Sequence, residues 1–94
     1  MIPSLIAEFI GTFVFLSIIL IQGEPIPIVV GLLAAIYAFG KVSGGHFNPA
    51  VSYMMFLKKS IDIPTFIAYI VVQILGASLA YIWWNYLNES KLIN

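Results

Sequence analysis

Three long apolar runs divide the chain, and short segments that contain glycine, proline or charged residues separate them. The first run covers residues 3–21, and Glu8 is its only charged residue. At ~1.5 Å per residue, a helix of this length reaches roughly 28 Å, about one hydrocarbon core. The second run covers residues 26–40 and ends at Lys41, and the third covers residues 63–86. The pattern predicts three membrane-spanning helices.

Residues 42–57 follow a different pattern, in which a loop with two glycines precedes a short apolar run. Asn48 is among the best N-cap residues and Pro49 is favoured at a first helical position, so we expect a helix to begin there. The apolar run ends at Lys58, which limits this helix to roughly 15 Å, half a hydrocarbon core. The segment is therefore predicted to be a re-entrant half-helix that reaches mid-membrane and stops.

The composition agrees with a lipid environment, because 62% of the residues are hydrophobic and only 9% are charged. A soluble chain has about 25% charged residues, and a small soluble domain could not bury so much apolar surface. The net charge of zero gives no attraction to nucleic acid, and the absence of cysteine excludes disulfides and thiolate metal sites. We predict an all-α integral membrane protein, multi-pass, that forms a single unit and has the lipid bilayer as its partner.

The loop before the half-helix has features that suit a polar path through lipid. Gly44 and Gly45 permit backbone angles that other residues resist. Backbone groups at membrane depth must be hydrogen-bonded or must line a water-filled cavity. Extended carbonyls, followed by the positive end of a helix and the Asn48 amide, would orient water or a hydroxyl group and disfavour a cation. The sequence therefore predicts a pore segment.

At this segment the chain resembles the aquaporin and aquaglyceroporin family. The likeness lies first in Ser43-Gly44-Gly45-His46-Phe47-Asn48-Pro49-Ala50-Val51-Ser52. Residues 7–12 are similar to the family's first-helix signature, and residues 73–77 resemble its third helix. The resemblance implies six spans in two inverted repeats, with two half-helices that meet at mid-membrane, and tetramers in which each subunit has its own pore. This chain has the first repeat only.

The resemblance implies a channel subunit for water or small neutral solutes such as glycerol. Two copies in opposite orientations would complete the pore as a homo-oligomer, or a second half-chain would supply the other half. The rival interpretation is a non-conducting fragment, or an interaction subunit, derived from a split aquaporin-like gene. No catalytic residue, metal site or cofactor is expected, because no nucleophile–base pair or metal cluster is found in the sequence.

The resemblance also assigns the residues that line the pore: Gly44, Gly45, His46, Asn48, Pro49 and Ala50. It places the narrow filter at Ile28 and, in a self-paired pore, at Ile36 and Val51. Val51 holds the position at which the second repeat of the family has an arginine. Since all three side chains are apolar, such a pore is expected to order water weakly, to prefer small neutral solutes and to exclude protons poorly.

Three polar side chains near the predicted pore have more than one possible role. For Glu8, the resemblance implies that it accepts hydrogen bonds that hold the pore loop; a proton relay and a position near the membrane interface are the alternatives. Gln73 is expected to hydrogen-bond the loop backbone from the third span, rather than to contact solute. His46 is expected to pack beside the loop, rather than to act as a pH gate or a metal ligand.

Small and aromatic residues in the spans suggest where the helices meet each other and the membrane surface. Gly11, Gly31 and Gly76 are expected at close helix crossings. Trp83, Trp84 and Tyr86 are expected in an interfacial belt.

The lysines predict the orientation of the chain. With the N-terminus inside, the inner side carries Lys41, Lys58 and Lys59. Lys91 falls outside with Glu24 and Glu89. The positive-inside rule favours this N-in orientation, which weakens the self-paired arrangement without excluding it.

Overall fold

Four helices account for most of residues 1–90, which are the residues that this computed structural model describes. They are α1 (Ile2–Ile21), α2 (Pro25–Ser43), α3 (Pro49–Leu57) and α4 (Ile63–Glu89). Helices α1, α2 and α4 are long and apolar enough to cross a membrane, whereas α3 has 9 residues and reaches roughly 14 Å. The predicted fold class, three transmembrane helices with one half-helix, is confirmed.

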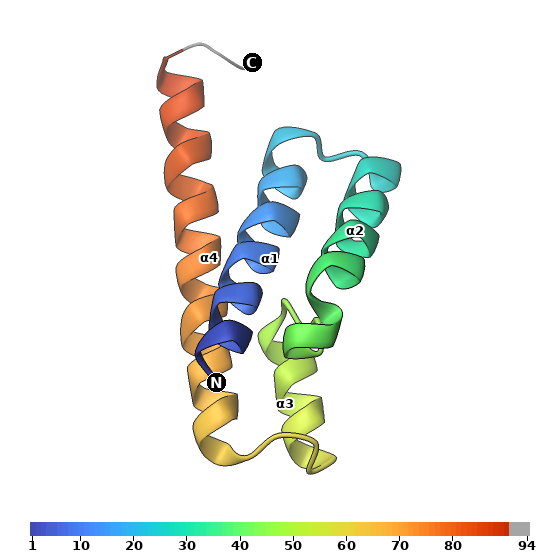
Figure 1. Cartoon of the computed structure of the whole chain (residues 1–94). Coiled ribbons are helices and arrows are strands. Elements are labelled where there is room, and N and C mark those ends of the chain that lie inside the picture. Colours follow the sequence, from blue (N-terminus) through green and yellow to red (C-terminus); the bar gives the residue numbers. More distant parts are fainter. Residues whose placement is uncertain (91–94) are drawn as a thin grey trace.

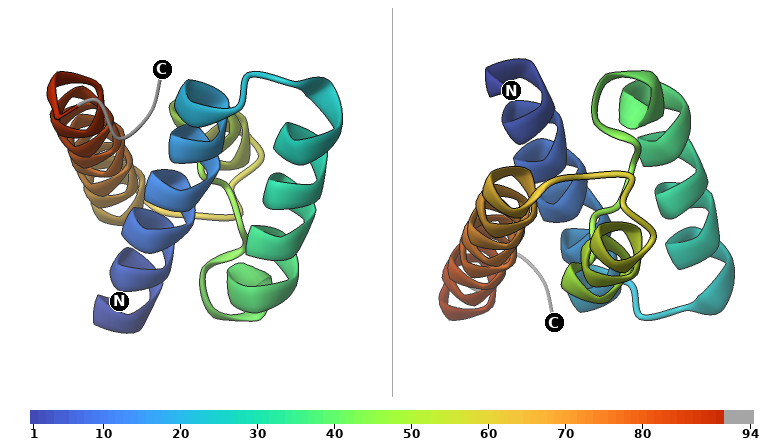
Figure 2. Two further views of the ribbon diagram at one scale, coloured as in Figure 1. Left: turned by 90° about the horizontal axis from the view of Figure 1, so that it is seen from above. Right: turned by 90° about the horizontal axis from the view of Figure 1, so that it is seen from below.

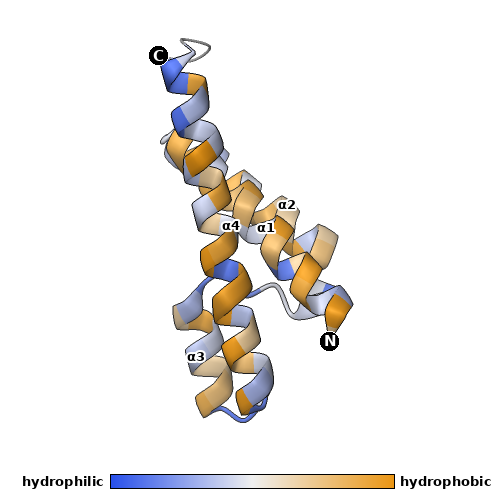
Figure 3. Ribbon diagram, turned by 90° about the vertical axis from the view of Figure 1, so that its left-hand side faces the viewer, coloured by the Kyte–Doolittle hydropathy of each residue, from blue (hydrophilic) through white to orange (hydrophobic). Residues whose placement is uncertain are grey.

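Helix α1 lies between α4 and α2 and packs against both (Figure 1). Helix α3 packs along the first turns of α4, and in the end-on views it lies between α4 and α2 (Figure 2). Helices α1 and α2 cross α4 obliquely, and apolar residues dominate all three spans (Figure 3). The half-helix therefore packs against α4, and its N-terminus lies beside residues of α1 and α4.

Glycines set two of the helix contacts. At Gly76 a Cβ atom would lie 2.9 Å from the carbonyl oxygen of Phe9, so only glycine lets α4 approach the α1 backbone this closely. At Gly31 a Cβ would meet the Ile18 side chain, which packs from α1 onto α2. Both glycines lie where the sequence predicts helix crossings.

Trp83 joins α4 to α1 as well as facing outward. Its indole N–H donates a 3.1 Å hydrogen bond to the Ser17 hydroxyl of α1, and its ring packs 6.4 Å from that of Phe13. The residue is 37% exposed, so one edge of the ring remains at the surface. The sequence pattern alone indicated the surface position and missed the bond between helices.

Helices α2 and α4 both extend further toward the C-terminus than the sequence pattern predicted. Helix α2 continues through Val42 and Ser43, which the sequence pattern assigned to the loop. It ends where Gly44 adopts a left-handed conformation, φ 93°, and its N–H bonds the Gly40 carbonyl. Lys41 does not end the helix, because a cation in the last turn is favoured by the helix dipole. Helix α4 likewise extends to Glu89, since its polar end residues are compatible with helix.

Helix α3 begins as predicted, with an extended polar cap followed by proline in the first turn, and α4 begins in the same way. Asn48 Oδ1 accepts the Ala50 N–H at 2.8 Å, and Asp62 Oδ1 accepts the Thr65 N–H at 3.0 Å. Hydrogen bonding from Thr65, first from its side chain and then from its backbone, holds the pKa of the Asp62 carboxyl below its ordinary value. Lys91, part of the orientation argument, lies outside the described residues.

Candidate functional site

The loop that joins α2 to α3 turns sharply at mid-chain. Gly44 and Gly45 have φ values of 93° and 66°, and Phe47 has φ 52°. This region of backbone space favours glycine, and a bulky residue adopts it only when its surroundings hold it there. The chain can therefore reverse direction within four residues and start α3 between the spans.

The loop amides all have acceptors within the protein. The Gly44 N–H bonds the Gly40 carbonyl at 2.8 Å, and the Gly45 N–H bonds the Ser43 hydroxyl at 3.1 Å. The next two amides bond the Glu8 carboxylate. Every N–H from residue 44 to residue 47 thus has an acceptor within the protein, and those of His46 and Phe47 point at the buried Glu8 carboxylate.

Glu8 of α1 is fully buried, and its carboxylate accepts four hydrogen bonds. Its Oε2 accepts from the Ser43 hydroxyl at 2.7 Å and the His46 N–H at 3.0 Å. Its Oε1 accepts from the Phe47 N–H at 2.8 Å and Gln73 Nε2 at 3.0 Å. A single side chain therefore connects α1, the end of α2, the loop and α4.

Most of the loop carbonyls, unlike the loop amides, have no hydrogen-bond partner within the described residues. The Ser43 carbonyl accepts a 2.6 Å hydrogen bond from the Tyr69 hydroxyl. The carbonyls of Gly44, Gly45 and His46 accept no hydrogen bond from any group in residues 1–90. Carbonyl groups at membrane depth without a protein donor require water or another polar partner.

The side chains behind the loop form a second hydrogen-bonded group. Gln73 Nε2 donates to Ser52 Oγ at 2.9 Å as well as to Glu8, so its partners are side chains and not the predicted loop backbone. Because Ser52 Oγ accepts from Gln73, its proton is free to point at His46 Nδ1, 2.8 Å away. The histidine ring is buried and packs edge-on against Tyr69, at 5.0 Å between centroids.

Gly11 serves the loop rather than a helix crossing, which corrects the prediction for this residue. A Cβ atom at Gly11 would overlap the Phe47 ring. Phe47 is 2% exposed and is one of the largest fully enclosed side chains. The missing side chain on α1 therefore makes room for the ring that anchors the end of the loop.

The start of α3 is open on one side. Asn48, Pro49 and Ala50 are exposed and Val51 is half-buried. Asn48 Oδ1 is occupied by the Ala50 amide, so Nδ2 is the end of the side chain that can donate outward.

A cavity of about 250 Å³ lies beside Asn48, between α1, α4 and the loop. Thr12 and Gln73 are among its lining residues. Both residues are buried, and Thr12 Oγ1 and Gln73 Oε1 have no hydrogen-bond partner within the described chain. A buried polar atom without a partner is costly, which marks this cavity as a place for water or for another polar group.

Comparison with known proteins identifies the family of this arrangement. The Major intrinsic protein family matches residues 1–92. This chain belongs to the major intrinsic protein family. The resemblance seen in the sequence is therefore confirmed, and with its three apolar helices the chain is an integral, multi-pass membrane protein.

Curated members of the major intrinsic protein family align over most of the chain. The chain is 44% identical over 84 residues to glycerol uptake facilitator protein-like 6 of Lactiplantibacillus plantarum, which covers 80% of this chain and 39% of that protein. It is 38% identical over 91 residues to the probable aquaporin PIP2-8 of Arabidopsis thaliana, covering 79% of this chain and 33% of the relative. The matched part of the chain thus corresponds to 39% and 33% of the length of these two relatives.

Two of the predicted filter residues, Ile28 and Ile36, lie far apart along α2 of this major intrinsic protein. Ile36 lies beside the loop, because a Cβ at Gly45 would be 3.6 Å from its Cγ1 atom. Ile28 is two turns nearer the start of α2, roughly 12 Å along the helix axis from Ile36. Val51 sits on the first turn of α3.

Several residues of the site were missed in the sequence, namely Ser43, Ser52, Tyr69 and Thr12. Ser43 and Ser52 are the first and last residues of the segment that carries the resemblance, which was the available signal. Nothing in the sequence distinguishes Tyr69 from the other aromatic residues of its span.

Proposed function

We propose that this chain is a channel subunit for the facilitated diffusion of water and small neutral solutes such as glycerol. One observation supports this most directly: the loop amides all have acceptors within the protein, while the carbonyls of Gly44, Gly45 and His46 have no donor within residues 1–90. A row of free acceptors at membrane depth suits molecules that carry hydroxyl groups. The names of the relatives, a glycerol uptake facilitator and an aquaporin, favour the same solutes.

In the proposed mechanism a permeating hydroxyl group donates to successive loop carbonyls and accepts from Asn48 Nδ2. The path thus offers a row of acceptors followed by one donor, so the molecule passes in single file with its dipole oriented. The positive end of the α3 dipole disfavours a passing cation at the same point. No covalent chemistry is involved.

The pore needs a second half, and the open side of α3 is where we place it. In one arrangement, two copies pair in opposite orientations; in the other, a second half-chain supplies the missing repeat. The cavity beside Asn48 supports a contact there, because Thr12 and Gln73 each leave a buried oxygen without a partner in the described part of the chain. In a self-paired pore, Ile28, Ile36 and Val51 would form an apolar filter.

Substitutions at Asn48 test conduction. Asn48→Asp keeps the oxygen that caps α3 but removes the outward N–H donor, so we expect osmotic water flux into proteoliposomes to fall roughly fivefold with the fold retained. Asn48→Ala should lower flux similarly and also reduce stability by about 1 kcal/mol, because the cap is lost. Stopped-flow light scattering with water and with glycerol gradients gives the rates.

A blocking variant and its control complete this test. Gly45→Trp should close the path, whereas Leu33→Trp, on an exposed face of α2, should leave flux unchanged. Wild-type rates no faster than those of protein-free vesicles would contradict conduction and would favour the non-conducting interaction subunit. Wild-type flux that survives Gly45→Trp would contradict this pore path.

Labelling at the end of α4 tests the self-paired arrangement. The chain has no native cysteine, so Ser90→Cys gives a single label site. If copies insert in both orientations, an impermeant maleimide added outside sealed vesicles should label about half of the protein, and the rest after the vesicles are opened. Labelling from one side alone would exclude antiparallel copies and would favour the arrangement in which a second half-chain completes the pore.

A further inference from the structure

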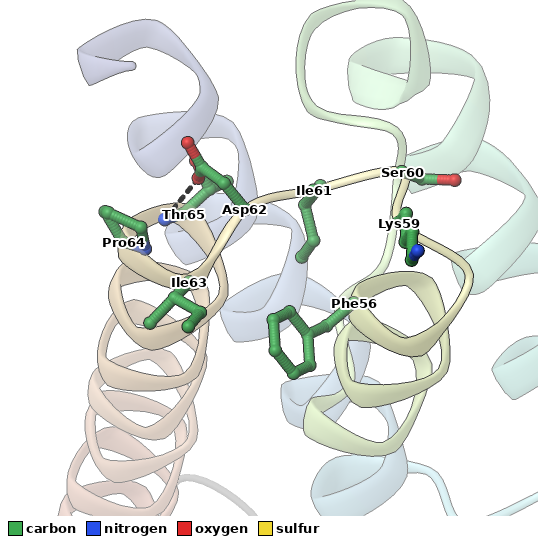
Figure 4. Close-up of a pocket in the computed structure, with 8 residues that line it drawn as sticks. All are labelled: Phe56, Lys59, Ser60, Ile61, Asp62, Ile63, Pro64 and Thr65. Carbon is green, nitrogen blue, oxygen red and sulfur yellow. Dashed lines mark hydrogen bonds between the residues drawn. The ribbon is translucent and has the colours of Figure 1, made fainter.

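An open groove of about 730 Å³ lies between the end of α3 and the start of α4, away from the proposed pore. Figure 4 shows Phe56, Ile61 and Ile63 across its apolar part, between the two helices. Phe56 is held in place by Phe66, whose ring stacks on it at 4.9 Å with 7° between the planes. The groove therefore has a fixed apolar wall next to the point where the chain leaves the membrane.

The polar residues of the groove are divided between its two sides. Lys59 and Ser60 lie on the α3 side, and Asp62 and Thr65 lie on the α4 side (Figure 4). Asp62 accepts the Thr65 amide and turns its carboxylate toward α4, away from Lys59. The α3 side thus keeps a positive charge that Asp62 does not neutralise.

Lys59 occupies a backbone position that does not favour lysine. Its N–H bonds the Phe56 carbonyl at 3.0 Å, and the next amide, of Ser60, bonds the Met55 carbonyl at 2.9 Å. This pair of hydrogen bonds ends a helix with a left-handed residue that is usually glycine, and Lys59 has φ 67°. The conformational cost of a side chain here suggests that the side chain has a use.

The charge of this end of the molecule matches an anionic membrane surface. Lys58 and Lys59 lie on the connection between α3 and α4, at the end of the molecule that also carries the N-terminus (Figure 1). Glu24 and Glu89 lie at the opposite end. Lysines gather on the cytoplasmic side of membrane proteins, where anionic lipids attract them by about 1 kcal/mol each.

We propose that this groove binds an anionic phospholipid. The headgroup phosphate lies against the Lys59 ammonium group and the Ser60 hydroxyl, with Lys58 beside it. The first part of an acyl chain covers Phe56, Ile61 and Ile63. The site is independent of conduction, and its occupant is a lipid of the surrounding bilayer rather than a permeating solute.

Lipid selectivity in nanodiscs tests the proposal. The whole chain is reconstituted in phosphatidylcholine with a small fraction of phosphatidylglycerol, and spin-labelled versions of both lipids report their relative association. We expect a preference for phosphatidylglycerol that Lys59→Gln reduces about fivefold. Lys41→Gln removes the same charge from the last turn of α2, outside the groove, and should reduce the preference much less.

Two further measurements distinguish a lipid site from a folding defect and from a site for free phosphate. Lys59→Gly should lose the preference while its thermal midpoint in pure phosphatidylcholine stays equal or rises, because glycine suits the left-handed position. Soluble glycerophosphate at millimolar concentration should not displace the lipid. The proposal would be overturned by any of three results. These are an equal loss of lipid preference in Lys41→Gln and Lys59→Gln, no preference for phosphatidylglycerol in the wild type, or displacement of the bound lipid by free glycerophosphate.

Discussion

Replacement of Glu8 by alanine is expected to lower the free energy of unfolding by about 3 to 5 kcal/mol. The carboxylate is fully buried and is the acceptor for four donors, which lie on α2, on the loop and on α4. Alanine would leave the amides of His46 and Phe47 without an acceptor in the protein interior. Equilibrium unfolding in mixed micelles with increasing denaturing detergent gives the change.

Hydrogen exchange distinguishes a specific loss of the loop from general destabilisation. The amides of His46 and Phe47 should exchange at least about tenfold faster in Glu8→Ala, a larger change than in the middle of α4. Glu8→Gln retains one carbonyl oxygen and should lose less stability than alanine. Ile10→Ala, at a partly exposed position of the same helix, is the control for a shortened side chain. A Glu8→Ala protein no less stable than Ile10→Ala would contradict the role of the carboxylate.

Gly76→Leu is expected to destabilise the chain by about 3 kcal/mol, the second largest effect. The first atom of a new side chain at Gly76 would already lie 2.9 Å from the Phe9 carbonyl oxygen and 3.2 Å from the Phe13 nitrogen. Both atoms belong to the α1 backbone, which cannot turn aside as a side chain could. The two helices must then move apart, and this movement also separates Glu8 on α1 from Gln73 on α4.

A matched substitution on the same helix controls for the added apolar volume. Ser78 is exposed and bonds only the Ile74 carbonyl within α4, so Ser78→Leu should change stability by less than about 1 kcal/mol. The same detergent-unfolding measurement serves for both variants. Equal effects of Gly76→Leu and Ser78→Leu would show that the close crossing is not important for stability.

The elements of this chain follow from local patterns. An apolar run as long as a hydrocarbon core predicts a span, and three such runs became α1, α2 and α4. Asn48 and Pro49 predicted the start of α3 correctly, because capping depends on a side chain and an amide two residues away. The end of α2 was less predictable, since Lys41 and Val42 are compatible with either helix or loop and the left-handed Gly44 decides it.

The partners within the site were harder to infer. The sequence suggested that Glu8 and Gln73 support the loop, yet it gave Gln73 the wrong partner, since its amide reaches Ser52 and Glu8 rather than the loop backbone. Gly11 was also assigned to a helix crossing, although it makes room for Phe47. A glycine in a span indicates a close approach without identifying the group that approaches.

The sequence by itself determined where the chain crosses the membrane, where a half-helix starts and which segment is polar enough to meet water, because each depends on neighbouring residues. Only the tertiary structure decided which groups that segment turns inward. Glu8 lies 38 positions from His46 and 65 from Gln73, and the pairing of such distant groups depends on how α1 and α4 cross. The crossing exists because Gly76 has no side chain. It places the buried Glu8 carboxylate where it accepts hydrogen bonds from the amides of His46 and Phe47, so that the loop carbonyls face away from it.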